Sequence, residues 1–140
     1  MEQLIEFVTN HWMLSVAFVV VAGMLMANLW GGAVAAGTQV GTADAIKLIN
    51  HEHALVLDVR EAAEFNKGHI LDAVNLPMSK FEERLAEFNE DRDRAIVVCC
   101  ATGSVAGRAS GSMKKAGFSK LHRLRGGMAA WQTDNLPLEH

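Results

Sequence analysis

The chain has 140 residues, with 13 Lys and Arg against 16 Asp and Glu and a net charge of −3. This length suits one domain of ordinary size rather than two, and the charge excludes the overall basicity that is typical of nucleic-acid-binding proteins. The two cysteines are neighbours, Cys99 and Cys100, which excludes a secreted disulfide scaffold because a bridge between adjacent residues is strained and closes no loop. Free thiols of this kind indicate a reducing compartment.

The N-terminal part of the chain contains a long apolar run. No charged residue lies between Glu6 and Asp44, and within this gap "WMLSVAFVVVAGMLMANLW" (residues 12–30) is 19 mostly apolar residues with Trp at both ends. As a helix this run spans about 30 Å of hydrocarbon, and tryptophans suit the two membrane interfaces. A helix of a soluble core would show a polar stripe, whereas this run has only Ser15 and Asn28. We therefore predict a transmembrane helix over residues 12–30, after a short N-terminal segment, residues 1–11.

A cleaved signal peptide is the main alternative for this segment, because "AVA" (residues 33–35) resembles a cleavage site. Glu2 and Glu6 precede the apolar run without any Lys or Arg, and the run is longer than a signal core, so an uncleaved anchor is favoured. The first basic residue after the span is Lys47. The positive-inside rule then predicts a single-pass protein of a bacterial inner membrane with its C-terminal domain in the cytoplasm.

The rest of the chain alternates between strand and helix patterns. "GGAVAAG" (residues 31–37) predicts a flexible linker, followed by one domain over residues 38–140. Apolar runs predict strands over residues 54–59, 73–77, 95–100 and 120–125. Helices are predicted over residues 42–50 with Thr42 as the cap, 61–66, 79–88 with a Ser79/Glu82 capping box, 104–116, and around Trp131. This alternation predicts an α/β fold, in which helices cover both faces of a parallel sheet.

The stretch "IVVCCATGSVAGRA" (residues 96–109) ends a buried strand on Cys100 and continues into a loop of small residues. Ligands bind at the carboxyl ends of strands in parallel sheets. A following helix N-terminus and accessible backbone N–H groups of a tight loop both stabilise an anion, and the thiolate is the nucleophilic form of cysteine. We therefore predict that Cys100 is reactive, whereas Cys99, inside the strand, packs in the core.

Three segments together resemble the rhodanese-like single-domain sulfurtransferases: "LDVREAAEFNKGHILDAVNLP" (residues 57–77), the cysteine stretch, and "GFSKLHRLRGGMAAWQTDNLPLE" (residues 117–139). The resemblance implies a three-layer fold with a central five-stranded parallel sheet. It places the strands that end at Asp58 and Arg125 on either side of the cysteine strand. It also implies that Cys100 is the nucleophile and that the loop amides bind the charge of a persulfide; the loop residues are Ala101, Thr102, Gly103, Ser104 and Val105.

The activity that this resemblance implies is sulfur transfer without a cofactor or metal. Cys100 would take sulfane sulfur from a small sulfur-containing anion such as thiosulfate, or from a persulfide, and pass it to cyanide, a thiol or a protein. The membrane, through the N-terminal helix, is the other expected partner, and no nucleic acid is expected. The related phosphatases have a loop one residue longer, which argues against phosphatase activity.

Two positions of the loop depart from the family pattern. Active loops often carry Arg at the second position and Arg or Thr at the sixth, where this chain has Ala101 and Val105. Each charge-assisted contact of that kind contributes about 1.5–3 kcal/mol, so we expect weak thiosulfate binding. Arg125 would replace the missing cations in part, helped by the absence of acidic residues from 95 to 133, unless it is only a solvated surface charge.

The remaining polar candidates are expected to support the fold. Asp58 and Arg60 are predicted to form an ion pair or turn cap, and His69 to be a structural hydrogen-bonding residue rather than a general base. His51 and His53 lack a third ligand nearby, so no metal site is predicted. Two other functions remain open: a membrane-tethered interaction module with a degenerate loop, and a redox or arsenate-reducing enzyme with Cys99 as the resolving thiol, which the strain of a vicinal disulfide disfavours.

Overall fold

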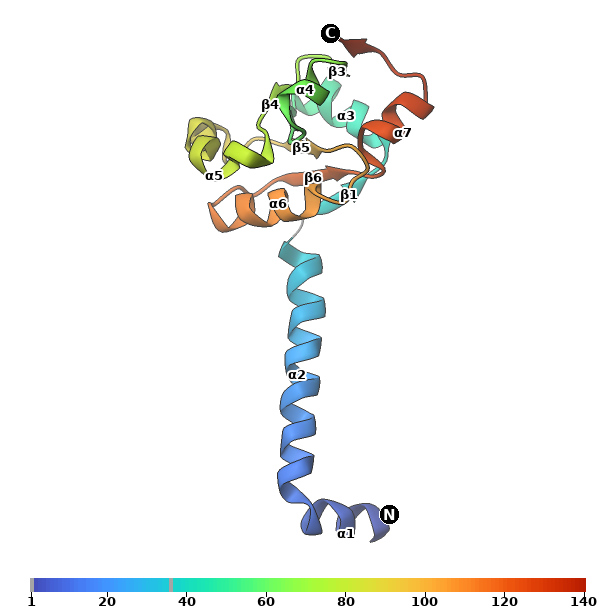
Figure 1. Cartoon of the computed structure of the whole chain (residues 1–140), viewed down its shortest axis with the longest axis vertical. Coiled ribbons are helices and arrows are strands. Elements are labelled where there is room, and N and C mark those ends of the chain that lie inside the picture. Colours follow the sequence, from blue (N-terminus) through green and yellow to red (C-terminus); the bar gives the residue numbers. More distant parts are fainter. Residues whose placement is uncertain (1, 36) are drawn as a thin grey trace. The chain divides into compact units, whose positions relative to one another are not determined.

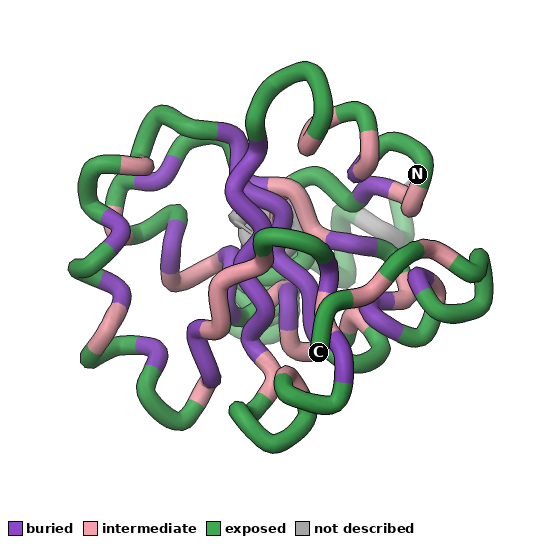
Figure 2. The backbone as a smooth tube through the Cα atoms, turned by 90° about the horizontal axis from the view of Figure 1, so that it is seen from above, coloured by how far each residue is buried: buried purple, intermediate pink, exposed green. Residues whose placement is uncertain are grey.

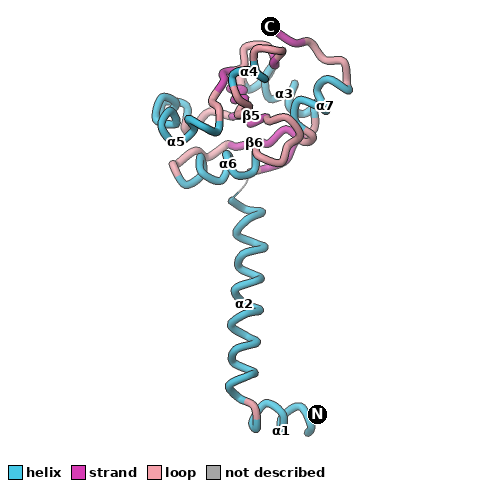
Figure 3. Tube along the Cα trace, viewed as in Figure 1, coloured by secondary structure: helices cyan, strands magenta, loops and turns pink. Residues whose placement is uncertain are grey.

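The computed structural model describes residues 2–35 and 37–140, which form two compact units (Figure 1). The first unit is the N-terminal helical segment, up to Val34, and the second runs from Ala35 to His140. Figure 3 shows that the first unit consists of helices joined by a short turn, whereas the second contains all the strands.

The N-terminal unit contains helix α1 (Glu2–Asn10) and helix α2 (Trp12–Ala35). The window Trp12–Leu29 of α2 has a mean hydropathy of 2.0, and none of it is buried inside the protein. Among the described residues, α2 is the one helix whose length and composition would allow it to cross a membrane.

The linker expected over residues 31–37 is wrong for most of its length, because α2 continues to Ala35. Once a helix has formed, each added residue gains one backbone hydrogen bond. Gly31 and Gly32 therefore continue α2 despite their low helix propensity. Residue 36, also part of that linker, lies outside the described residues.

The second unit is built on a parallel sheet with strand order β1-β6-β5-β2-β4, so the predicted five-stranded parallel sheet is confirmed. In chain order its strands are β1 (Thr38–Val40), β2 (Leu55–Asp58), β4 (Val74–Asn75), β5 (Ile96–Cys99) and β6 (Leu121–Leu124). β1 and a small antiparallel pair, β3 (His69–Ile70) with β7 (Leu138–Glu139), had no recognisable pattern in the sequence. These strands have only two or three residues, too few to show an alternating pattern.

Helices cover both faces of the sheet. One face carries α5 (Phe81–Arg84), the 3₁₀ segment η2 (Leu85–Asp91) and α6 (Ala106–Lys115). The other carries α3 (Thr42–Glu52) and α7 (Gly127–Thr133). The short elements α4 (Ala62–Phe65) and η1 (Met78–Lys80) connect the strands.

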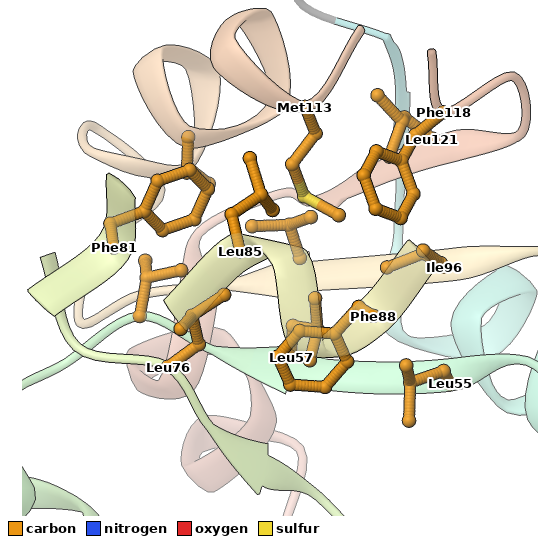
Figure 4. Close-up of a cluster of buried hydrophobic side chains, with 14 of the residues drawn as sticks. Leu55, Leu57, Leu76, Phe81, Leu85, Phe88, Ile96, Met113, Phe118 and Leu121 are labelled. Atoms are coloured by element: carbon orange, nitrogen blue, oxygen red, sulfur yellow. The ribbon is translucent and has the colours of Figure 1, made fainter. Parts of the chain in front are cut away.

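The core follows from the two-residue period of the strands. Along the cysteine strand, Ile96, Val98 and Cys100 join the cluster under α5, η2 and α6, whereas Val97 and Cys99 join the cluster under α3 and α7. Figure 4 shows the first cluster, where Met113 and Phe81 approach the strands from different helices. The buried segments gather around the central strands in Figure 2. A strand buried on both faces reads as a continuous apolar run, which is why "AIVVCC" was recognisable.

Two predicted helix caps are wrong. Gly41 is the N-cap of α3, and the Thr42 hydroxyl instead donates to the Asp134 carboxylate at 2.5 Å. The Ser79 hydroxyl donates to the carboxylate of Glu61 at 2.8 Å, not to the helix that follows it. In both cases the hydroxyl donates to a carboxylate from elsewhere in the chain, because a carboxylate is a stronger acceptor than a neutral group. The helix expected over residues 79–88 is accordingly broken into η1, α5 and η2.

Candidate active site

Cys100 lies directly after β5, at the carboxyl edge of the sheet. Only 3% of the residue is exposed, and it belongs to the cluster under α5 and α6. The Gly103 N–H donates to the Cys100 Sγ atom, with an N–Sγ distance of 3.0 Å. A donor aimed at sulfur stabilises negative charge on it. Gly103 adopts a φ of 91°, which the other residue types rarely adopt.

The residues after Cys100 form an irregular loop that ends where α6 begins at Ala106. Ala101, Thr102 and Ser104 are exposed, whereas Gly103 and Val105 are half-buried. Within the part of the chain that the structure describes, one loop amide, that of Gly103, donates to the sulfur. The N–H groups of four other loop residues donate to no protein group there; these are Ala101, Thr102, Ser104 and Val105. They are therefore available to a bound anion.

The orientation of the loop is set by the start of α7. The Met128 N–H donates to the Cys100 carbonyl at 2.8 Å, and the Ala129 N–H donates to the Ala101 carbonyl at 3.0 Å. In a trans peptide the C=O and the next N–H point in opposite directions. The N–H groups of Ala101 and Thr102 are therefore turned away from α7.

This close approach depends on the glycine pair at the start of α7, its N-cap Gly126 and its first residue Gly127. Gly126 and Gly127 have φ values of 73° and 57°. A Cβ atom on Gly127 would lie 2.2 Å from the Cys100 carbonyl oxygen and 2.9 Å from the Gly103 nitrogen, which is not sterically possible. In the sequence, "GG" indicated only the end of a strand. The contact of Gly127 with Cys100, which lies 27 residues earlier, became visible only in the fold.

Cys99 is fully buried and lies on the opposite face of the strand from Cys100. Burial, together with the charge of the Asp58 carboxylate, raises the pKa of the Cys99 thiol well above its ordinary value. Asp58 is its register partner on β2. The prediction that Cys99 packs in the core is therefore confirmed, and its thiol is held in the protonated, unreactive form.

Asp58 and Arg60 form a buried ion pair beside the site. The Arg60 Nη2 atom lies 2.6 Å from the Asp58 Oδ2 atom, and the Arg60 backbone N–H also donates to this carboxylate, at 3.0 Å. Nη2 donates further to the Gly68 carbonyl, at 2.8 Å, and the Asn75 side-chain amide donates to the carbonyls of Asp58 and Arg60. The pair ties β2 to the segments around β3 and β4, which confirms the expected ion pair and turn cap.

His69 is held by local contacts. Its ring stacks on Phe65 with the ring centroids 3.8 Å apart, and its Nδ1 atom lies 3.0 Å from the Phe65 carbonyl oxygen. Its Nε2 atom is 3.6 Å from the Glu139 carboxylate. These contacts join α4 to β7, as expected for a structural histidine. Among the residues that the structure describes, no group of three His, Cys, Asp or Glu could hold a metal ion.

Arg125 follows β6, the strand beside the cysteine strand. Its backbone N–H donates to the Val40 carbonyl at 2.8 Å, and its side chain is exposed. Its neighbour Gly126 contacts the loop, because the Gly126 nitrogen would be 3.3 Å from a Cβ atom on Gly103. Across the described ranges, the Arg125 guanidinium makes no hydrogen bond or ion pair. The structure thus places the Arg125 backbone one residue from a contact with the loop, and its side chain is exposed.

Comparison with known proteins identifies relatives of the whole chain and of the domain. The profile of the Rhodanese-like domain matches residues 42–134. The uncharacterized protein YibN of Escherichia coli is 29% identical over 139 residues, which cover 99% of this chain and 97% of YibN. A sulfurtransferase of Allochromatium vinosum is 35% identical over 92 residues, covering 66% of this chain and 84% of that protein.

Solved structures share the fold of the second unit. A rhodanese-related protein from Thermoplasma volcanium superposes with a TM-score of 0.66 at 27% identity, over 73% of this chain and 97% of that one. A thiosulfate sulfurtransferase from Pseudomonas aeruginosa gives a TM-score of 0.66 at 24% identity, over 74% of this chain and 20% of that one. At the latter identity the likeness shows only a shared fold.

The first prediction concerns the contact between Gly127 and the loop. We expect Gly127→Ala to lower the free energy of unfolding by more than about 2 kcal/mol, because the new methyl group clashes with backbone and the φ is unfavourable. Gly111→Ala in α6 is the matched control, since its Cβ would meet nothing within 4 Å. This control should raise stability by about 0.5–1 kcal/mol. Urea unfolding of both variants measures the difference, and equal stabilities would contradict the steric constraint.

The second prediction concerns the buried ion pair. Arg60→Ala leaves the Asp58 carboxylate buried without its cation, which should cost about 3 kcal/mol of stability. Lys67→Ala removes an exposed partner of Glu64 and should change the unfolding curve little. If the two variants unfold at the same urea concentration, the ion pair does not stabilise the site in the way described.

Proposed function

The chain belongs to the rhodanese-like family of sulfurtransferase-type proteins, and on this premise we propose that it transfers sulfane sulfur through a persulfide on Cys100. The observation that carries the proposal is the environment of the Cys100 Sγ atom. This sulfur lies at the carboxyl edge of the sheet, 3.0 Å from the Gly103 nitrogen, and the loop that follows it has four further amides that donate to no protein group in the described chain. Cys99, its neighbour, is protonated and faces the other side of the sheet.

The proposed reaction needs no oxidant or reductant beyond its substrates. The Cys100 thiolate attacks the outer sulfur of thiosulfate, the S–S bond of the donor breaks, and sulfite leaves with the electron pair of that bond. Cys100 then carries a persulfide anion, whose charge the loop amides would bind. An acceptor thiolate or cyanide attacks the terminal sulfur, the Cys100–sulfur bond breaks, and the thiolate is restored.

The choice of donor follows from the charges around the loop. Ala101 and Val105 place no cation there, and the nearby Arg125 guanidinium is exposed. A dianion such as thiosulfate would therefore be bound weakly, whereas a persulfide donor, with one negative charge at most on its sulfur, needs less compensation. We propose that thiosulfate is a slow donor and that Arg125 provides what charge compensation there is.

The proposal includes anchoring of the domain by α2 in a bacterial inner membrane. The apolar length of α2 supports a single span, and the match to YibN supports a shared N-terminal segment because it covers 99% of the chain. All 13 Lys and Arg follow the span, which favours a cytoplasmic domain by the positive-inside rule. The sulfur acceptor would then be a cytoplasmic thiol or protein.

A membrane-tethered interaction module is the second candidate function. The 3% exposure of Cys100 and the lack of a cationic side chain within the loop favour it. In this case the fold would be used for docking, and Cys100 would form no persulfide with any donor.

The third prediction separates these two functions. After incubation with thiosulfate or a low-molecular-weight persulfide, the intact mass of the protein should increase by one sulfur atom. The increase should be absent in Cys100→Ser and retained in Cys99→Ala, because the Cys99 thiol is buried and protonated. The absence of any adduct on the wild-type protein with both donors would support the interaction module instead.

The fourth prediction concerns Arg125. We expect Arg125→Ala to raise the KM for thiosulfate by about twofold to fivefold, as removal of one solvent-exposed ion pair would do. The kcat should change less. Lys120→Ala, an exposed cation just before β6 begins, is the control and should leave both constants unchanged. Unchanged thiosulfate kinetics in Arg125→Ala would show that this guanidinium is only a solvated surface charge.

A further inference from the structure

The outward face of α6 is basic. Ala106, Ala109 and Met113 are buried on one side of this helix. With 3.6 residues per turn, Arg108 and Lys115 lie on the opposite side, and both are exposed. No carboxylate pairs with either of them among the described residues, and there is no Asp or Glu at all between residues 95 and 133.

The same helix adjoins the point where the chain enters the domain. The Arg123 Nη2 atom donates to the Gly37 carbonyl at 3.4 Å, and its Nη1 atom would lie 3.3 Å from a Cβ atom on Gly107. Arg123 therefore lies between the first turn of α6 and Gly37. Helix α2 ends at Ala35, two residues before Gly37. A very short stretch of chain therefore joins α2 to this part of the domain.

A second, opposite charge lies over the same face of the sheet. The exposed residues of α5 and η2 include Glu82, Glu83, Glu87 and Glu90, and of these only Glu87 is paired with a cation, Arg84, in the described structure. α5 and η2 cover the first hydrophobic cluster together with α6. An anionic surface would therefore attract α6 and repel α5 and η2. It would favour the orientation of the domain in which α6 faces the surface.

We propose that the outward face of α6, defined by Arg108 and Lys115, binds the headgroups of anionic lipids in the membrane that α2 spans. This inference rests on the proposed membrane span. A short connection holds the domain at high effective concentration near the lipid surface, which favours lipid over a freely diffusing acidic protein. Lys and Arg within a Debye length of an anionic leaflet each strengthen such binding, and salt weakens it.

The test uses the full chain in lipid nanodiscs, in a Cys100→Ser background so that single labelling cysteines are usable. One fluorophore is placed at Ser112, a partly exposed residue of α6, and another at Ala86, an exposed residue of η2. Lipids that carry a headgroup quencher report proximity to the bilayer. In discs with phosphatidylglycerol we expect quenching at residue 112 but not at residue 86. We expect it to be lost at high salt and in phosphatidylcholine discs.

Charge reversal identifies the residues responsible. The double variant Arg108→Glu with Lys115→Glu should reduce the ratio of membrane-bound to unbound domains by about tenfold or more. Quenching at residue 112 measures this ratio. Lys47→Glu with Lys67→Glu makes the same change of charge on α3 and after α4 and should have no such effect. Three results would overturn the proposal: quenching that does not depend on lipid charge, equal quenching at residues 112 and 86, and quenching that is unchanged by the α6 charge reversal. A chain that does not enter nanodiscs would refute the membrane span itself, while leaving sulfur transfer by Cys100 untouched.

Discussion

The site depends on one close approach between backbones. The start of α7 comes within van der Waals distance of the cysteine loop, because Gly126 and Gly127 have no side chains that would hold the loop away. The N–H groups of Met128 and Ala129, in the first turn of α7, donate to the carbonyls of Cys100 and Ala101. With these carbonyls bound, the intervening amides face away from α7. The loop thereby gains N–H groups for an anion without a single cationic side chain of its own.

The direction of the sheet separates the two ends of the domain. All five strands are parallel, so the chain enters at the amino edge with Gly37 and β1, whereas Cys100 lies at the carboxyl edge. The buried ion pair of Asp58 and Arg60 holds the neighbouring strand connection at this carboxyl edge. The point where the chain enters the domain and the candidate site therefore lie at opposite edges of the sheet.

Charge is distributed unevenly over the domain. Within the loop, electrostatic stabilisation comes from peptide groups, which bind a small anion at short range but steer substrates little from a distance. The exposed cations Arg108, Lys115 and Arg125 lie instead on α6 and after β6. The exposed acids that form no ion pair in the described structure, Glu82, Glu83 and Glu90, lie on α5 and η2. The surface charge of the domain is therefore asymmetric, and this asymmetry does not depend on the residues around Cys100.

The sequence by itself determined the features that depend on local patterns. The apolar run of α2, the doubly buried strand that ends at Cys99, and the parallel α/β alternation were all recognisable because burial leaves a periodic or continuous apolar signal. The family motifs located Cys100 and its loop. Only the tertiary structure decided how the loop is oriented, since the Gly127 contact joins segments far apart in the chain. It also decided the partners of Thr42 and Ser79, because a distant carboxylate outcompetes a local cap, and a sequence does not show which distant groups folding will bring together.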